Sequence, residues 1–150
     1  MVNPFDIRSV LTAKHAQHVV LIHFPIALFL VGVFFDFIAQ IAKRSVFAAV
    51  AYYNLFGAAL SALPVVATGL LAWQFQLEGQ KLKGILLMHL LLGSTSLALI
   101  WIAWLFHRRS RGQFAPSLPF FRLGFEMLAV VVVMLTSHLG GFLSGVNGPG

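Results

Sequence analysis

The sequence of 150 residues contains no cysteine, so the chain can form no disulfide, no thiolate zinc or iron–sulfur site and no covalent c-type haem attachment. Charged residues are also scarce, at 9% of the chain, and only four of them are acidic. A soluble domain of this length carries far more charge, so the composition excludes an ordinary soluble protein. No nucleophile–base arrangement or phosphate-binding loop is visible, which argues against a hydrolase or a kinase.

The chain is instead rich in apolar sequence, with 59% hydrophobic residues and a mean hydropathy of +0.91. Four apolar stretches, each long enough to cross a bilayer, are separated by short polar segments. They cover residues 19–42, 46–73, 84–106 and 123–143. Short loops make successive helices antiparallel neighbours, so we expect an all-α protein, a transmembrane four-helix bundle with up-down-up-down order.

The remaining segments fit a single domain covering residues 1–150. Residues 1–18 mix apolar and charged side chains in a way that predicts a short N-terminal helix lying in the membrane interface. Pro25 removes one backbone hydrogen bond near the start of the first span, so we expect the helix either to kink near Leu21 or to begin near Pro25. The last segment, residues 144–150, predicts a flexible tail.

Basic residues flank the apolar spans, and their distribution predicts the orientation of the bundle. A net charge of +6 beside apolar spans suits lipid headgroups, so we expect the lipid bilayer as a partner and no nucleic acid. Six basic residues fall on the side of the first and third connections and four on the other side, the larger set being Lys43, Arg44, Arg108, Arg109, Arg111 and Arg122. The positive-inside rule then places both termini outside the cytoplasm.

Three histidines lie at one depth in such a bundle, each on a different helix. His23 is four residues inside the first span, His89 five residues inside the third, and His138 five residues before the end of the fourth. At 1.5 Å per residue all three sit roughly 6–8 Å below one membrane surface. One histidine near an interface usually keeps its tip in the headgroups, but three on separate helices favour a shared site.

The other three histidines are less informative. His18 and His15 lie just above the shared level, in the interface. His18 and His23 are five residues apart, about 140° around a helix, so both can face one spot only if the chain is distorted near Pro25. His107 lies among arginines at the opposite end and, like His15, is expected to be interfacial.

A second polar layer is expected at the end opposite the three histidines, from Asp36, Asn54, Arg122 and Glu126. Arg122 and Glu126 are four apart on one helix face and can form an ion pair. The interpretation we favour is a set of polar contacts that holds the helices together. The alternative is a proton path in which Asp36 or Glu126 acts as the relay.

Motifs in three of the spans carry a family resemblance. They are His18-x4-His23-Phe-Pro-Ile-Ala-Leu, Ala62-Leu-Pro-x4-Gly69-Leu-Leu-Ala-Trp73 and His138-Leu-Gly-Gly-x-Leu143. On these motifs nearly the whole chain resembles the bacterial "predicted membrane protein" family, domain of unknown function 2231. The chain departs from the family pattern at Val19, where members usually have proline, and at Asn147, where many have histidine. The resemblance implies a multi-pass protein of the bacterial inner membrane, and with the charge distribution it implies periplasmic termini.

The histidines lead us to expect a b-type cytochrome-like electron-transfer protein or subunit rather than an enzyme. Haem b would be held near the non-cytoplasmic face by His18, His23, His89 and His138. His23 and His89 are the expected axial ligands of the haem iron, because the first and third helices can be diagonal in a four-helix bundle. Small residues near His89 and His138 would make room for the porphyrin, and the partners would be other membrane or periplasmic redox subunits.

Two other interpretations stay open. The first is a cofactor-free accessory or structural subunit of a respiratory or photosynthetic membrane complex. The second is a zinc or copper site formed by three imidazoles, which ranks lower because no carboxylate lies near them to orient the rings. A transporter is less favoured still, since four helices without an inverted repeat offer little pathway.

Overall fold

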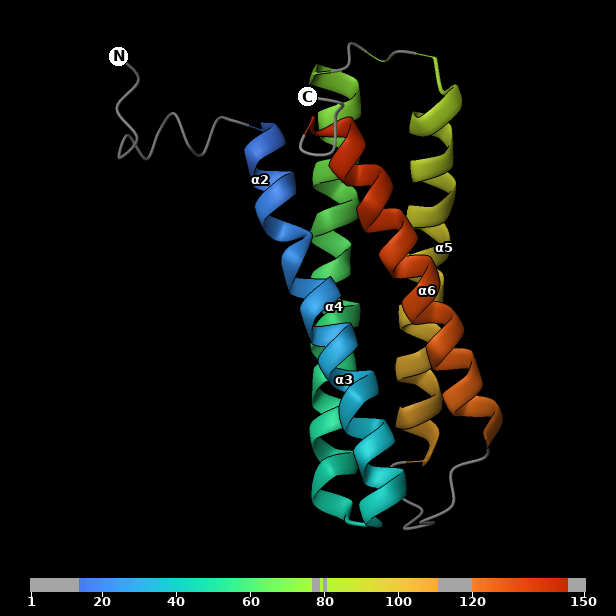
Figure 1. Ribbon diagram of the computed structural model, residues 1–150. Coiled ribbons are helices and arrows are strands. Elements are labelled where there is room, and N and C mark those ends of the chain that lie inside the picture. The colour runs from blue at the N-terminus through green and yellow to red at the C-terminus, as the bar shows by residue number, and fades with distance from the viewer. Residues whose placement is uncertain (1–13, 77–78, 80, 111–119, 146–150) are drawn as a thin grey trace.

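The computed structural model describes residues 14–76, 79, 81–110 and 120–145. All regular structure in this part of the chain is helical. The helices are α2 (Lys14–Leu21), α3 (His23–Ala42), α4 (Ser45–Gln76), α5 (Gly84–Ser110) and α6 (Phe120–Leu143). Successive long helices run in opposite directions along one axis (Figure 1). The predicted all-α fold is confirmed, and the predicted span boundaries differ from those of α3 to α6 by at most four residues.

The first span is interrupted at Ile22, between α2 and α3. Pro25 has no amide hydrogen and cannot donate to the Leu21 carbonyl one turn earlier. Backbone hydrogen bonds continue across the break, from Ile22 N to His18 O at 3.1 Å and from Ile26 N to Ile22 O at 3.4 Å. The break between α2 and α3 therefore lies next to Leu21, where the sequence predicts a kink as one of two alternatives. The rest of the predicted interfacial helix, residues 1–13, and of the predicted tail, residues 146–150, lies outside the described residues.

The four long helices form a closed ring around a common interior. α3 packs against α4, α4 against α5, α5 against α6, and α6 returns to α3, while α2 packs on α4. This order places α3 and α5 on one diagonal of the bundle, as expected. The start of α3 and the ends of α4 and α6 consequently share one end of the molecule, and the ends of α3 and α5 and the starts of α4 and α6 share the other (Figure 1).

Small residues allow the helices to approach closely. Gly32 of α3 packs directly on Leu55 of α4, with an added Cβ only 2.8 Å from Leu55 Cγ. The fully buried side chains of Phe29 and Leu55 fill the centre together with the alanines Ala58, Ala59, Ala103 and Ala129. Close backbone approach through small residues is the usual way in which helices associate in lipid, where no hydrophobic force drives them together.

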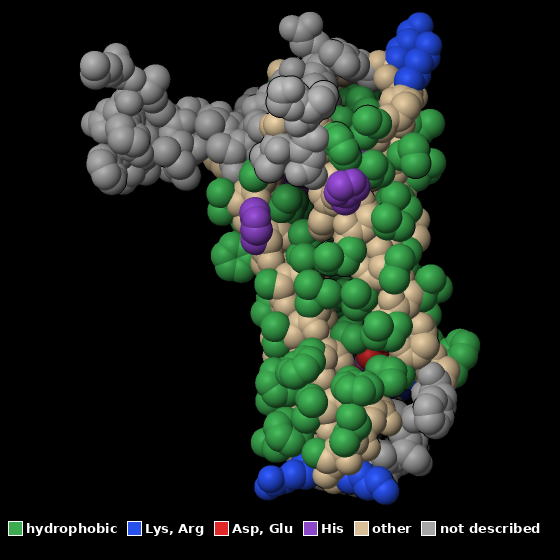
Figure 2. All heavy atoms as spheres, in the orientation of Figure 1, with side chains coloured by type: hydrophobic (Ala, Val, Ile, Leu, Met, Phe, Trp, Pro, Cys, Tyr) green, Lys and Arg blue, Asp and Glu red, His purple; other side chains and the backbone are tan. Residues whose placement is uncertain are grey.

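The outer surface of the bundle is as apolar as its interior. Exposed phenylalanine, leucine, valine and methionine side chains cover all four long helices, and Figure 2 shows the apolar side chains along the length of one face. Four helices are long and apolar enough to cross a membrane, over Gln17–Ala42, Ser45–Phe75, Gly84–Arg109 and Phe121–Leu143. The chain is therefore a multi-pass membrane protein whose exterior faces lipid.

Candidate functional site

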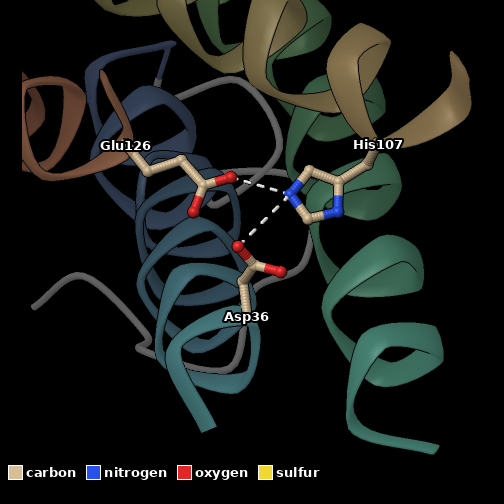
Figure 3. Close-up of side chains that lie close together, drawn as sticks. All are labelled: Asp36, His107 and Glu126. Atoms are coloured by element: carbon tan, nitrogen blue, oxygen red, sulfur yellow. Dashed lines mark hydrogen bonds and ion pairs between the residues drawn. The ribbon is translucent and has the colours of Figure 1, made fainter. Parts of the chain in front are cut away.

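Four ionisable side chains are buried together inside the bundle. They are Asp36 of α3, His107 of α5, and Arg122 and Glu126 of α6, and we call them the ionisable cluster. None of the four residues is more than 5% exposed. Figure 3 shows the carboxylates of Asp36 and Glu126 both directed at the imidazole of His107. Ionisable residues are rare inside membrane bundles, which makes this cluster the leading candidate for a functional site.

The ends of three helices position the cluster. His107 lies in the last turn of α5, Arg122 and Glu126 lie in the first two turns of α6, and Asp36 lies two turns before the end of α3. Antiparallel packing brings these positions to one level. Four exposed basic side chains lie at the same end, which we call the basic end: Lys43, Arg44, Arg108 and Arg109. Figure 2 shows basic side chains at this end and an acidic side chain just inside it.

Two short contacts hold the cluster. Arg122 Nη2 donates to Asp36 Oδ1 at 2.5 Å, which ties α6 to α3. His107 Nε2 lies 2.7 Å from Glu126 Oε1, which ties α5 to α6. Two longer contacts complete the cluster, at 4.0 Å between His107 Nε2 and Asp36 Oδ2 and at 3.8 Å between Arg122 Nε and Glu126 Oε1. The predicted pairing of Arg122 with Glu126 is present, but the shorter bond of Arg122 is to Asp36.

The charges of the cluster do not balance without a proton. Two carboxylates face one guanidinium, so the net charge is −1 while His107 is neutral. One proton, on His107 or on Glu126, makes the cluster neutral. An uncompensated buried charge costs several kcal/mol. A proton held at the 2.7 Å contact between His107 and Glu126 would remove this uncompensated charge.

Each carboxylate of the cluster keeps one buried oxygen without a hydrogen-bond partner. These atoms are Asp36 Oδ2 and Glu126 Oε2. Two buried donors without partners lie one helical turn from cluster residues, Nε2 of Gln40 on α3 and Nε1 of Trp104 on α5. Buried polar groups almost always find a partner, and bound water commonly supplies it. Gln40 and Trp104 therefore add two buried donors to the unmatched acceptors of the cluster at this end of the bundle.

An apolar layer separates the cluster from the opposite end. It contains Phe29, Leu55, Ile100 and Val133, each at most 4% exposed. The next buried polar side chain of α5 in the described chain is Ser96, whose hydroxyl lies 2.9 Å from Thr136 Oγ1 of α6. Ser96 precedes His107 by eleven residues, roughly 16 Å along the helix. The described side chains consequently form no continuous polar path through the bundle.

Three residues of the cluster also have the chemistry of metal ligands. Asp36, His107 and Glu126 are the one such group among the described residues, with ligand atoms within 4.8 Å of one another. Arg122, however, already binds one oxygen of Asp36 and places a positive charge beside any ion held there. A dication would leave the cluster positively charged, whereas a proton leaves it neutral, so the geometry favours the proton.

The sequence of this four-helix protein matches the profile of the predicted membrane protein family DUF2231 over residues 14–148. The chain belongs to the DUF2231 family. No curated protein and no solved structure matches it. The family resemblance expected from the histidine and glycine motifs is thus confirmed.

In this DUF2231 protein the two histidines of the first motif face different surroundings. His18 is half-buried against α4, where its Nδ1 lies 3.2 Å from Thr68 Oγ1 and its ring lies against Gly69. His23 is exposed, and its Nδ1 lies 3.3 Å from the carbonyl oxygen of Val20. Their five-residue spacing predicts this divergence, because the kink at Ile22 does not bring the two rings to one side.

His89 and His138 also differ in their surroundings. His89 is half-buried between α5 and α6, and its Nδ1 donates to the carbonyl oxygen of Thr136 at 3.1 Å. Its ring lies against Gly140, where an added Cβ would be 3.2 Å from His89 Cε1. His138 is exposed and packs edge-on against Phe142, with ring centroids 5.0 Å apart. Gly140, which is expected to make room for a porphyrin, lies against the imidazole of His89.

The predicted convergence of His23, His89 and His138 is not seen in this DUF2231 protein. Within the part of the chain that the structure describes, these histidines do not form a group of close metal-ligand atoms. His18 and His89 contact different helices, α4 and α6. Ligation of haem by these residues stays a prediction.

The prediction for His107 is wrong. It was expected at the interface, but its side chain is 5% exposed and contacts Glu126. The signal that could have identified it is depth, since the last turn of α5 lies level with the first turns of α6. Asn54, expected in the same polar layer, instead donates to the Val50 carbonyl of its own helix at 2.9 Å.

Proposed function

We propose that this protein is a membrane subunit that binds and exchanges one proton at the ionisable cluster. The observation that carries the proposal is the buried 2.7 Å contact between His107 Nε2 and Glu126 Oε1. It lies in a cluster whose fixed charges leave one negative charge uncompensated. Buried carboxylate and histidine residues in membrane bundles are the usual components of proton relays.

The two halves of the cluster have different roles in this proposal. Asp36 and Arg122 form an ion pair that holds α3 against α6. His107 and Glu126 share the mobile proton, which comes from water and returns to water. Histidine suits this role because its unperturbed pKa, about 6.5, lies closest to neutral pH among the side chains of the cluster.

The position of the cluster sets the side from which it takes the proton. It lies at the basic end, which the positive-inside rule assigns to the cytoplasm. In a bacterial inner membrane the termini would then be periplasmic, and the cluster would exchange its proton with the cytoplasm. The absence of a polar path through the described bundle favours a subunit that binds and releases a proton over a channel.

The proposed setting is a larger membrane complex. The apolar exterior offers contacts to lipid and to neighbouring subunits along all four helices. A cofactor-free accessory subunit of a respiratory or photosynthetic complex, one of the two alternatives from the sequence, fits a bundle whose distinctive feature is a proton-binding cluster.

Infrared difference spectroscopy tests whether the ionisable cluster binds a proton. The protein in lipid nanodiscs would be titrated around neutral pH while the carboxylic acid and imidazolium bands are followed. We expect one bound proton that is lost in Glu126→Gln and retained in the matched control Glu78→Gln, which changes the segment between α4 and α5. A wild-type cluster that holds no proton at neutral pH would refute the proposal.

A second candidate function is electron transfer through haem b. The observation that favours it is the hydrogen bond from His89 Nδ1 to the Thr136 carbonyl, because a carbonyl can only accept. The neutral ring then carries its lone pair on Nε2, the arrangement common among metal-ligating histidines. An oxidised-minus-reduced spectrum of the purified protein, with metal analysis, tests this candidate, and a colourless protein without iron would remove it.

A further inference from the structure

We infer that the ionisable cluster exchanges its proton with the basic end only, through water held between Gln40 and Asp36. The inference rests on the proposed proton site and adds the access path and its sidedness. Gln40 is a positioning residue in this path, since a carboxamide orders water and does not itself carry the proton.

The first step is the match between two buried atoms on α3. Asp36 Oδ2 is an acceptor without a partner, and Gln40 Nε2 is a donor without a partner. The two residues are four apart and so lie on one face of the helix, one turn from each other. One water between them would satisfy both atoms and would lie next to the carboxylate that faces His107.

The second step is the direction in which Gln40 lies. It follows Asp36 toward the C-terminal end of α3, so it stands between the cluster and Lys43. Gln40 is half-buried although its Nε2 atom is fully covered, so another part of the residue is exposed at the surface of the bundle, two residues from the end of α3. Water bound at Nε2 is therefore about one helical turn from the membrane surface.

The third step is the apolar layer that separates the cluster from the end of the bundle opposite the basic end. Phe29 and Leu55 are completely buried below the cluster, and Ile100 and Val133 complete the apolar layer. Water is not stable in a dry apolar layer that offers it no polar partners. Trp104, whose Nε1 atom is a buried donor without a partner, lies one turn below His107 and marks the inner limit of the polar region.

The charged groups around the path come from all the packed helices. Asp36 is on α3, His107 on α5, and Arg122 and Glu126 are on α6, while Lys43 and Arg108 stand at the membrane surface. The described part of α4 contains no acidic, basic or histidine residue. Its titratable side chains near this level are the half-buried phenol of Tyr52 and the exposed phenol of Tyr53, and its half-buried amide, Asn54, donates to the Val50 carbonyl. Gln40 is consequently the one uncharged polar side chain with an unpartnered atom between the cluster and the surface in the described chain.

The test separates the proton site from its access path. Inside-out and right-side-out membrane vesicles containing the protein would receive a rapid change of external pH, and the response of the carboxyl and imidazole bands would be timed. We expect a fast response only when the basic end faces the changed medium. In that orientation Gln40→Leu should slow the response about tenfold or more without changing the number of protons bound at equilibrium.

Two further variants complete the experiment. Gln40→Asn should restore part of the rate, because it keeps the amide donor on a shorter side chain. Gln74→Leu makes the same substitution at the exposed, opposite end of α4 and should leave the rate unchanged. Equal responses in both vesicle orientations, or an unchanged rate in Gln40→Leu, would overturn the inference while leaving the proton site in place. A wild-type cluster without a proton would instead overturn the proposed function.

Discussion

Arg122 Nη2 donates to Asp36 Oδ1 at 2.5 Å, across 86 positions of sequence, with both side chains at most 5% exposed. The bond connects α6 to α3, the helices that close the ring of the bundle. Removing one partner of a buried ion pair leaves the other charge buried without compensation, whereas removing both partners need not destabilise the protein. The pair therefore orders the cluster even if its net contribution to stability is small.

Removing only one partner of this ion pair should destabilise the protein. We expect Arg122→Met to lower the free energy of unfolding by ~3–5 kcal/mol, because it leaves Asp36 ionised and unpaired. The double variant Asp36→Leu/Arg122→Met should recover most of that loss. Unfolding in a denaturing detergent measures both. Additive losses in the double variant would show that the two residues do not act as a pair.

Amide substitutions within the cluster should preserve the fold. Asp36→Asn keeps an oxygen that accepts from Arg122, and Glu126→Gln keeps an oxygen within reach of His107. We expect both variants to insert and assemble normally, as judged by gel filtration and circular dichroism, while Glu126→Gln loses the bound proton. Failure of Glu126→Gln to fold would mean that the cluster is purely structural.

The contact between Gly32 and Leu55 should be sensitive to a single methyl group. A Cβ at position 32 would lie 2.8 Å from Cγ and 2.9 Å from Cδ2 of a fully buried leucine. We expect Gly32→Ala to destabilise the bundle by ~1–3 kcal/mol through overpacking. Gly124→Ala is the matched control, since nothing lies within 4 Å of its added Cβ, and it should be neutral or gain up to ~1 kcal/mol of helix propensity. Equal effects at the two positions would argue against close packing at Gly32.

If the protein binds haem, the spectrum should depend on particular histidines. His23→Ala or His89→Ala should abolish the haem bands while the protein still inserts, because packing against lipid is unchanged. His138→Ala should keep the haem and shift its potential. His107→Ala provides a control at the opposite end and should leave the spectrum unchanged. A spectrum insensitive to His23 and His89 would reject them as axial ligands.

Reporter fusions can determine the orientation of the bundle. A reporter after Gly150 and another near Gln113 should report opposite sides of the membrane, with the terminus outside the cytoplasm. The expectation follows from the excess of basic residues beside the first and third connections. A cytoplasmic C-terminus would reverse the assignment and would make the basic end periplasmic.

Hydropathy and connectivity alone were sufficient to predict the four long helices and the shared level of Asp36, Arg122 and Glu126. The rise of 1.5 Å per residue and the antiparallel order place Asp36, Arg122 and Glu126 at one level without any structure. Pro25 likewise predicts the interruption near Leu21, because the missing donor follows from its covalent structure.

Rotation of each helix about its axis could be decided only by tertiary packing. A membrane helix that is apolar on every face has no hydrophobic stripe to indicate which side turns inward. Depth therefore suggested a shared site for His23, His89 and His138, but packing leaves His23 and His138 exposed. For the same reason the sequence did not reveal that the ring of His107 turns inward, where it contacts Glu126 and lies 4.0 Å from Asp36.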